Sequence, residues 1–359
     1  GRLIHSGDFK LDEKPVVGEA FDYELWKKVC SSGVRAFICD STNVFSENEG
    51  RSESEVAPEI RKLIKKCSEM VVATTFASNV ARIKSIAEAA EKAGRSVCLM
   101  GRAMKRMIEV SLDSGVLSDF PKLISPEDAK TVPKRNLLLI VTGSQGERRA
   151  ASAQLANGKY KGMTLSAGDL FLFSSKTIPG NERGVIKIIN RLSEKGVDVV
   201  EDSSGKYHVS GHANRPEISK IHDIVSPQFL LPMHGEHRHL REHVKLGAAK
   251  GIAGLIATNG MMVDLSGNQL KVVDHIDTGR LYLDGTSKFG ALDGIIRDRL
   301  KLAINGLIVV NIIIDENDKM LGEPWCEIRG LADIGQSDCN FVDVLEEDVS
   351  QYIGRLSIG

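Results

Sequence analysis

Residues 206–243 read KYHVSGHANRPEISKIHDIVSPQFLLPMHGEHRHLREH and hold seven of the nine histidines of this 359-residue chain. Two of them, His212 in the sequence SGHA and His234 in PMHGE, stand in tight polar turns. A glycine beside a histidine lets the backbone come close to a ligand. The apolar run FLL at 229–231 predicts a short buried strand, which would place His234 at a strand's carboxyl end, where α/β proteins gather their sites. The stretch therefore favours a chemical role over simple packing.

Two acidic residues follow strand-like runs near the start of the chain. Leu3 and Ile4 begin a strand that leads through a glycine turn to Asp8, and the apolar run at 34–39 ends in Asp40. An acid after a turn glycine is common in ordinary turns, so the residues alone favour a structural role for Asp8. The chain begins with glycine, already close to this first strand, and we expect it to be an internal part of a longer protein.

The hydrophobic period changes from residue 52 onward. Ser52 and Glu55 form a capping box in front of an amphipathic helix that runs to about residue 66. Further strands are predicted at 70–76, 96–100, 136–142, 169–174 and 197–201, and helices at 79–93, 102–113 and 183–195. Strands that alternate with helices indicate a parallel sheet with helices on its faces. Alternating residues at 254–285 predict hairpin strands instead.

Four separated motifs carry a resemblance to a known family. HVSGHA at 208–213 and PMHGEH at 232–237 resemble motifs B and C of the β-CASP nucleases of the metallo-β-lactamase superfamily, and GDFK at 7–10 and TGSQGE at 142–147 are similar to ribonuclease J. The resemblance implies an α/β fold with a partial metallo-β-lactamase αββα sandwich, completed by the 254–285 hairpins. It divides the chain into lactamase parts at 1–52 and 206–292, an inserted β-CASP α/β domain at 53–205, and the start of a small α+β C-terminal domain at 293–359.

The resemblance also implies roles for individual residues. Asp8 would bridge two metal ions, a task that suits the two oxygens of a carboxylate, and His234 would bind one of them. His212 would protonate or steady the leaving oxygen, and Asp40 would raise its pKa and fix its tautomer. Binding of RNA is implied for Ser210, Gly211, Ala213, Gly143, Ser144, Gln145 and Ser78. For Ser78, a helix N-cap is an equally good interpretation.

The implied function is that of a zinc-dependent 5′-3′ exoribonuclease and endoribonuclease of RNA processing and decay, with two Zn²⁺ ions per site, RNA as its substrate and a homodimer formed through the C-terminal domain. The formal net charge of -1 means that any basic RNA-binding surface must be local. Six scattered cysteines without a C-x-x-C pair indicate buried, reduced thiols in a cytoplasmic protein. No apolar run approaches the length of a membrane span, and no signal peptide is visible.

One departure from the family bears on mechanism. The H-x-H-x-D-H motif, which supplies most of the metal ligands in that family, is absent from the 359 residues. Asp8 and His234 are two ligands where a zinc site takes at least three from protein. We therefore expect this chain alone to be inactive, and the alternative function is a catalytically inactive RNA-binding or dimerisation fragment.

Two further enzyme classes remain as alternatives. A β-CASP endonuclease for RNA 3′ ends would share the site, although the C-terminal domain argues against it. His239 and His243 match the metalloprotease pattern H-x-x-E-H, but no third ligand is evident, and the family resemblance places the metal at His234.

Overall fold

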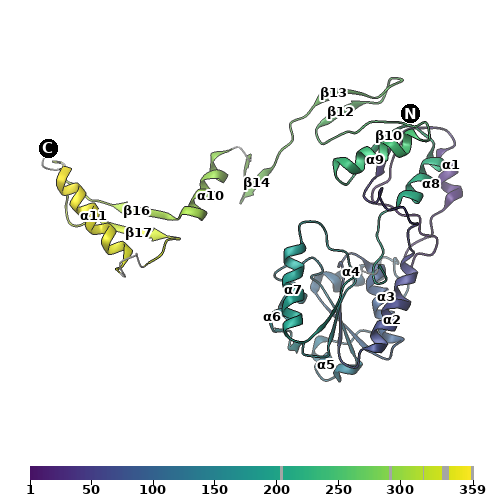
Figure 1. Ribbon diagram of the computed structural model, residues 1–359, viewed down its shortest axis with the longest axis horizontal. Helices are drawn as coiled ribbons and strands as arrows, with labels where there is room; N and C mark the ends of the chain where they lie inside the picture. Colours follow the sequence, from purple (N-terminus) through teal and green to yellow (C-terminus); the bar gives the residue numbers. More distant parts are fainter. Residues whose placement is uncertain (203–204, 291–292, 318, 334–338, 357–359) are drawn as a thin grey trace. The chain divides into compact units, whose positions relative to one another are not determined.

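A computed structural model describes residues 1–202, 205–290, 293–317, 319–333 and 339–356 (Figure 1). The chain forms two compact units, Gly1–Asp274 and His275–Gly359, and each is described by itself. Among the helices that the structure describes, none combines the length and apolar content that crossing a membrane requires.

A four-stranded parallel sheet of the first unit is assembled from distant parts of the chain. Its order is β1 (Leu3–His5), β2 (Val34–Asp40), β10 (Pro227–Met233) and β11 (Ala253–Gly254). The apolar runs in β2 and β10 bury Phe37 and Leu230 completely. These side chains share a core with Ile221 of α8 (Arg215–Val225). Helix α1 (Tyr23–Cys30) packs on α8, and α9 (His237–Ala248) packs on β10 and β11.

A five-stranded parallel sheet lies between the two halves of the first one in the sequence. Its order is β4 (Ser96–Met100), β5 (Leu137–Val141), β3 (Val71–Thr74), β8 (Leu170–Phe173) and β9 (Asp198–Val200). Successive side chains of a strand point to opposite faces, so Leu138 and Leu139 of β5 enter different cores. Such continuous apolar runs are typical of parallel strands that are covered on both faces.

Helices cover both faces of this second sheet (Figure 1). One core contains side chains of α2 (Val56–Lys66), α3 (Val80–Glu91) and α4 (Arg102–Asp113), and the other those of α6 (Ala151–Asn157) and α7 (Glu182–Glu194). The shorter elements are η1 (Glu53–Glu55), α5 (Pro126–Ala129), η2 (Lys134–Asn136), β6 (Lys159–Tyr160) and β7 (Met163–Thr164). The predicted parallel sheet with helices on its faces is confirmed, with element bounds shifted by a residue or two.

The hairpins predicted at 254–285 form, but they do not complete the sandwich. β12 (Met261–Asp264) pairs with β13 (Lys271–His275), and in the second unit β14 (Leu281–Asp284) pairs with β15 (Ser287–Gly290), each as a separate two-stranded sheet. Every residue of β13 is exposed. The predicted hairpins are therefore present, and their strands pair with each other rather than with the four-stranded sheet.

The second unit also contains α10 (Gly294–Asn305), β16 (Leu307–Asn311), β17 (Trp325–Arg329) and α11 (Phe341–Leu356). β16 and β17 are antiparallel, and α11 packs on β17. Four of the five residues of β16 are exposed. The predicted small α+β domain is present, with much of its apolar surface uncovered.

The cysteines are not all buried, contrary to the prediction from their apolar surroundings. Cys30, Cys39, Cys98 and Cys326 are buried, but Cys67 is only half-buried and Cys339 is exposed. Cys339 follows polar residues in the sequence, and it lacks the apolar strand-like surroundings of Cys39 and Cys98.

Candidate metal and catalytic site

Three strand ends of the first sheet meet at one edge. β1, β2 and β10 are parallel neighbours, so their carboxyl ends lie together. Asp8 lies just beyond β1, Asp40 ends β2, and His234 follows β10 directly. The His234 Nδ1 atom lies 3.2 Å from Asp8 Oδ1 and 3.4 Å from Asp40 Oδ1. One ligand atom from each of these residues lies within 4.8 Å of the others, so the three can surround a cation.

His234 adopts a backbone conformation that favours this arrangement. Its φ angle of 63° lies in the left-handed region, which is uncommon for a residue with a side chain. Gly235 follows with φ of 75°, and α9 begins soon afterwards. A Cβ atom at Gly235 would come within 2.9 Å of the His239 side chain. Strained backbone of this kind gathers at ligand sites, which supports a functional role for His234.

Asp40 and His212 form a hydrogen-bonded pair beside this cluster. The Asp40 side chain is only 2% exposed, and its Oδ2 atom lies 2.7 Å from His212 Nδ1. Its other oxygen accepts hydrogen bonds from the backbone N–H and the hydroxyl of Thr42. Burial alone would raise the pKa of Asp40, but the hydrogen bonds from His212 and Thr42 outweigh it and lower that pKa. The bond to Asp40 in turn raises the pKa of His212, against the effect of burial.

The loop that carries His212 is fastened on both sides. The Asn43 side chain donates hydrogen bonds to the Ser210 hydroxyl and to the His212 carbonyl. The backbone N–H of His212 donates to the same hydroxyl, and that of Ala213 to the Phe9 carbonyl. The Ser210 hydroxyl is thus part of the loop's own structure. Thr42 and Asn43 were missed from the sequence, although the polar run DSTN directly after a strand was a signal for them.

The other predicted RNA-binding residues lie on loops of the second sheet. Gly143, with φ of 108°, and the buried Ser144 follow β5. The Gln145 side chain accepts a hydrogen bond from the Ile178 N–H and donates one to the Lys176 carbonyl. These contacts show that the Gln145 side chain holds the neighbouring loop.

Ser78 is exposed before α3 and does not cap that helix. The N-cap of α3 is Asn79, whose side chain accepts a hydrogen bond from the Arg82 N–H. The alternative interpretation of Ser78 as an N-cap was therefore wrong by one residue.

The H-x-x-E-H motif of α9 does not build a metalloprotease site. His239 Nδ1 accepts a hydrogen bond from the Glu236 N–H, and Glu242 pairs with Arg215. His243 is fully buried, with Nδ1 2.8 Å from the Ser41 hydroxyl. Its two histidines thus have separate structural tasks.

A buried histidine pair lies beneath the candidate site. The Nε2 atoms of His243 and His222 are 2.9 Å apart, and their rings stack with centroids 5.0 Å apart. Burial lowers the pKa of His222 to about 4 and that of His243 to about 3. Cys39 lies close enough to complete a possible Cys-His-His ligand set. Because both Nε2 atoms already bond to each other, the geometry fits a neutral packing network better than a metal site.

The buried pair predicts a loss of stability on acidification. In the unfolded chain these histidines bind protons below about pH 6.5, whereas in the folded protein they stay neutral until the pH reaches their lower pKa values. Between these two limits, each unit by which the pH is lowered reduces the unfolding free energy by about 1.4 kcal/mol for each histidine. His222→Gln removes one of these groups, so its pH dependence should be correspondingly weaker. Urea unfolding from pH 8 to 5 measures this. The difference in unfolding free energy between the variant and the parent should be constant above about pH 7.5 and change below it. A difference that stays constant down to pH 5 would contradict the lowered pKa of His222.

The Asp40–His212 pair predicts a second titration effect. Asp40→Asn removes the negative partner that raises the pKa of His212, so that pKa should fall. NMR titration of the His212 ring protons, assigned with a His212→Gln variant, measures the change. Thr42→Val is the matched control because Thr42 bonds to Asp40 but not to the imidazole. Equal shifts in both variants, or no shift in Asp40→Asn, would rule out Asp40 as the cause of the raised pKa.

Three family models match the chain in succession. They are the ribonuclease J β-CASP domain over residues 68–192, the Zn-dependent metallo-hydrolase RNA specificity domain over 204–256, and the ribonuclease J C-terminal domain over 294–358. The second match contains His212 and His234, and the first contains the five-stranded sheet apart from β9.

Curated relatives match along nearly the whole chain. Ribonuclease J of Sinorhizobium meliloti is 39% identical over 97% of this chain and 62% of its own length. Ribonuclease J of Corynebacterium glutamicum is 34% identical over 97% of this chain and 49% of its own length, and that of Thermus thermophilus 35% over 88% and 56%. The chain thus spans between about half and three fifths of these relatives. The succession of domains and these identities show that the chain is similar to ribonuclease J along nearly its whole length.

Proposed function

We propose that the chain provides part of the active site of a zinc-dependent ribonuclease, which cleaves RNA as a 5′-3′ exonuclease and as an endonuclease. The observation that carries the proposal is the meeting of Asp8, Asp40 and His234 at one sheet edge, beside the His212 ring that is hydrogen-bonded to Asp40. The matches to a Zn-dependent metallo-hydrolase RNA specificity domain and to ribonuclease J support the metal and the substrate class.

Asp8 and His234 would hold the metal. The Asp8 carboxylate is exposed and offers oxygens to hard cations, and the His234 imidazole suits zinc. Asp40 is less suited, because its Oδ1 already accepts two hydrogen bonds from Thr42 and its Oδ2 faces His212. Bound zinc would supply an activated water and would offset the negative charge of the phosphodiester.

His212 would give its proton to the leaving oxygen of the RNA. Its raised pKa keeps the ring protonated at higher pH than an ordinary histidine, and the ring is 28% exposed, so the proton can reach a substrate. Asp40 holds Nδ1, which leaves Nε2 as the nitrogen that would face the phosphodiester. The division of work resembles other catalytic histidines that a buried carboxylate orients.

RNA would follow the loops that carry the remaining predicted contacts. Ser210, Gly211 and Ala213 lie beside His212, and we propose that they bind the phosphate next to the cleaved bond. Ser78, Gly143, Ser144 and Gln145 follow strands β3 and β5 of the second sheet. The Ser144 side chain is buried and the Gln145 side chain is hydrogen-bonded to the neighbouring loop. Backbone groups of this loop would therefore make the contacts with RNA.

The number of metal ligands favours a second candidate function for the chain taken alone. Asp8 and His234 do not complete a zinc site, even with Asp40 nearby, and the H-x-H-x-D-H motif is absent from the sequence. The chain alone would then bind RNA or dimerise without catalysis.

We also propose the domain bounds 1–52, 53–205, 206–292 and 293–359, and a homodimer formed through the last domain. Large apolar side chains are exposed in the described part of this last domain, including Leu300 at 58% and Ile304 at 79%. Exposed apolar surface of this extent is typical of interaction sites. The match to the ribonuclease J C-terminal domain falls within the last of these bounds.

Zinc content and RNA cleavage test the enzyme assignment. The 359-residue chain is compared with a version extended upstream along its gene, using an RNA with a 5′-monophosphate. We expect the extended version to bind about two zinc ions and to degrade the RNA, and His234→Ala to lower both zinc content and rate, the rate by about 100-fold or more. His237→Ala is the matched control, an exposed histidine of α9 outside the site. An extended version that neither binds zinc nor cleaves RNA would refute the enzyme and leave the binding function.

Sedimentation of the chain tests the dimer. Ile308 and Val310 of β16 are both exposed, and replacing both with lysine should place charges on the proposed interface and shift the chain to a monomer. Leu25→Lys is the control, because Leu25 is an exposed apolar residue of α1 in the first unit. A parent chain that sediments as a monomer at tens of micromolar would show that the proposed dimer does not form under these conditions.

A further inference from the structure

A buried arginine links the five-stranded sheet to the segments that carry the candidate site. Arg82 on α3 has no exposed surface, although charged side chains are seldom fully buried unless they are paired. Its guanidinium donates to both oxygens of Glu53, at 2.5 and 2.8 Å. It also donates to the carbonyls of Ser174 and Tyr207, at 2.9 and 3.2 Å. The planar guanidinium of Arg82 thus donates hydrogen bonds to three different segments of the chain.

Apart from Ser174, which follows β8, the partners of Arg82 belong to the two places where the chain crosses between the sheets. Glu53 lies in η1, where the chain enters the second sheet's domain, and Tyr207 lies where it leaves. On the leaving segment Arg82 also contacts His208 Nδ1 at 3.1 Å and the Val209 carbonyl at 3.5 Å. Burial and the charge of Arg82 lower the pKa of His208 to about 4, so its Nδ1 remains an acceptor at neutral pH.

The leaving segment, residues 207–209, leads directly into the His212 loop. Val209, which Arg82 contacts, is followed by Ser210, Gly211 and His212. The Ser174 hydroxyl accepts a bond from Arg82 and donates one of 2.6 Å to the Tyr207 carbonyl, which fixes the same segment a second time. The His212 loop is therefore held by Asn43 from the first sheet and by Arg82 from the second.

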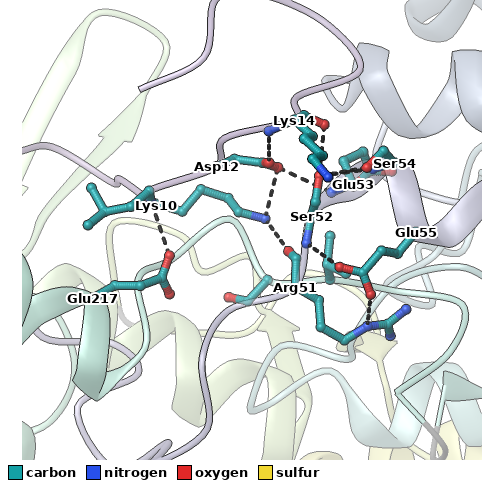
Figure 2. A network of polar contacts seen from close by, with 12 residues as sticks. Lys10, Asp12, Lys14, Arg51, Ser52, Glu53, Ser54, Glu55 and Glu217 are labelled. Atoms are coloured by element: carbon teal, nitrogen blue, oxygen red, sulfur yellow. Dashed lines mark hydrogen bonds and ion pairs between the residues drawn. The ribbon is translucent and has the colours of Figure 1, made fainter. Parts of the chain in front are cut away.

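The entering segment leads to the other side of the site. The Glu53 N–H donates to Asp12 Oδ2, and Lys10 Nζ donates to the Arg51 carbonyl at 2.7 Å, as Figure 2 shows. The Ser52 hydroxyl donates to the Lys14 carbonyl in the same network. These bonds join the segment after β1, which contains Asp8, to the Arg82-bound Glu53.

We propose that Arg82 is a positioning residue, which fixes the His212 loop and the segment after Asp8 relative to each other by binding both crossing segments at once. The proposal rests on the proposed function only for its effect on catalysis. Its structural part stands on the contacts alone: one side chain holds two segments that are far apart in sequence, and each leads to one part of the site. Arg82 touches neither metal ligand and is not itself a catalytic residue.

Hydrogen exchange of the full chain, followed by mass spectrometry, tests the positioning role. Arg82→Lys keeps a positive charge for Glu53 but loses the fork that reaches Tyr207, His208 and Val209. We expect the backbone amides of residues 207–214 to exchange about tenfold faster or more, with little change in the strands of the second sheet.

Arg95→Lys is the matched control. Arg95 is also buried, and it donates to the carbonyls of Glu69, Leu137, Ile64 and Cys67, none of which lies in a crossing segment. Its replacement should speed exchange near those residues and leave 207–214 unchanged. Unchanged exchange of 207–214 in Arg82→Lys, or an equal increase in both variants, would overturn the proposal.

Ser174→Ala decides the question if Arg82→Lys fails to fold. This variant keeps Arg82 and removes the hydroxyl that bonds to the Tyr207 carbonyl. It should speed exchange of 207–214 in the same direction by a smaller factor, and no increase would overturn the proposal.

Cleavage kinetics separate positioning from binding in the version extended upstream along its gene. Arg82→Lys should lower kcat about tenfold or more with little change in KM, because RNA would bind as before to a misplaced His212. Arg95→Lys should leave kcat unchanged. A raised KM with unchanged kcat would overturn the positioning role. An extended version without any cleavage would refute the proposed function, whereas the exchange result would still decide the role of Arg82.

Discussion

The parallel pairing of β2 with its two neighbours is the constraint on which the candidate site depends. β1 and β10 both run alongside β2, although they lie near residue 4 and near residue 230. A parallel sheet brings the carboxyl ends of its strands to one edge, and here these ends carry two carboxylates and an imidazole. Neither strand could slip by one residue without turning its buried side chains toward solvent. The register that packs Phe37 and Leu230 is therefore also the register that assembles the site.

The candidate site combines an accessible part with a buried support. Asp8 and His234 keep much of their side-chain surface in solvent, whereas Asp40 is almost completely covered. A buried carboxylate is costly unless its oxygens are hydrogen-bonded, and Asp40 meets this condition through Thr42 and His212. Behind it, Ser41 is bonded to the neutral pair of His243 and His222. Packing and polar contacts around Asp40 together thus hold the orientation of the partly exposed His212 ring.

Much of this architecture could be predicted from the sequence, for identifiable physical reasons. The continuous apolar runs of β3, β5 and β8 fit only strands covered on both faces, and the helices between them showed a regular period. The placement of Asp8, Asp40 and His234 at strand ends followed from other apolar runs, those of β1, β2 and β10. That these three strands are neighbours did not, because pairing depends on distant contacts. The family resemblance suggested this neighbourhood.

The features that could not be predicted from the sequence depend on contacts between distant segments, which no local pattern of residues indicates. Arg82 stands in a helix with other charged residues and has the pattern of a solvated surface position, yet segments 29 and 125 residues away enclose it. Ser78 and Asn79 are equally good N-caps by residue type, and only the hydrogen bond to the Arg82 N–H decides between them. The missed α8, in contrast, had a local signal in the capping box of Asn214 and Glu217, with Pro216 in the first turn.

The closeness of the two crossing segments has a consequence for how such a fold can arise. Glu53 and Tyr207 bound a stretch with a core of its own, and both lie within reach of one guanidinium. A stretch whose ends meet can be inserted into a surface loop of an older protein without separating the strands on either side. Such an insertion would leave the pairing of β2 with β10 intact, and the added stretch could then vary in size and surface without moving the strand ends at the candidate site.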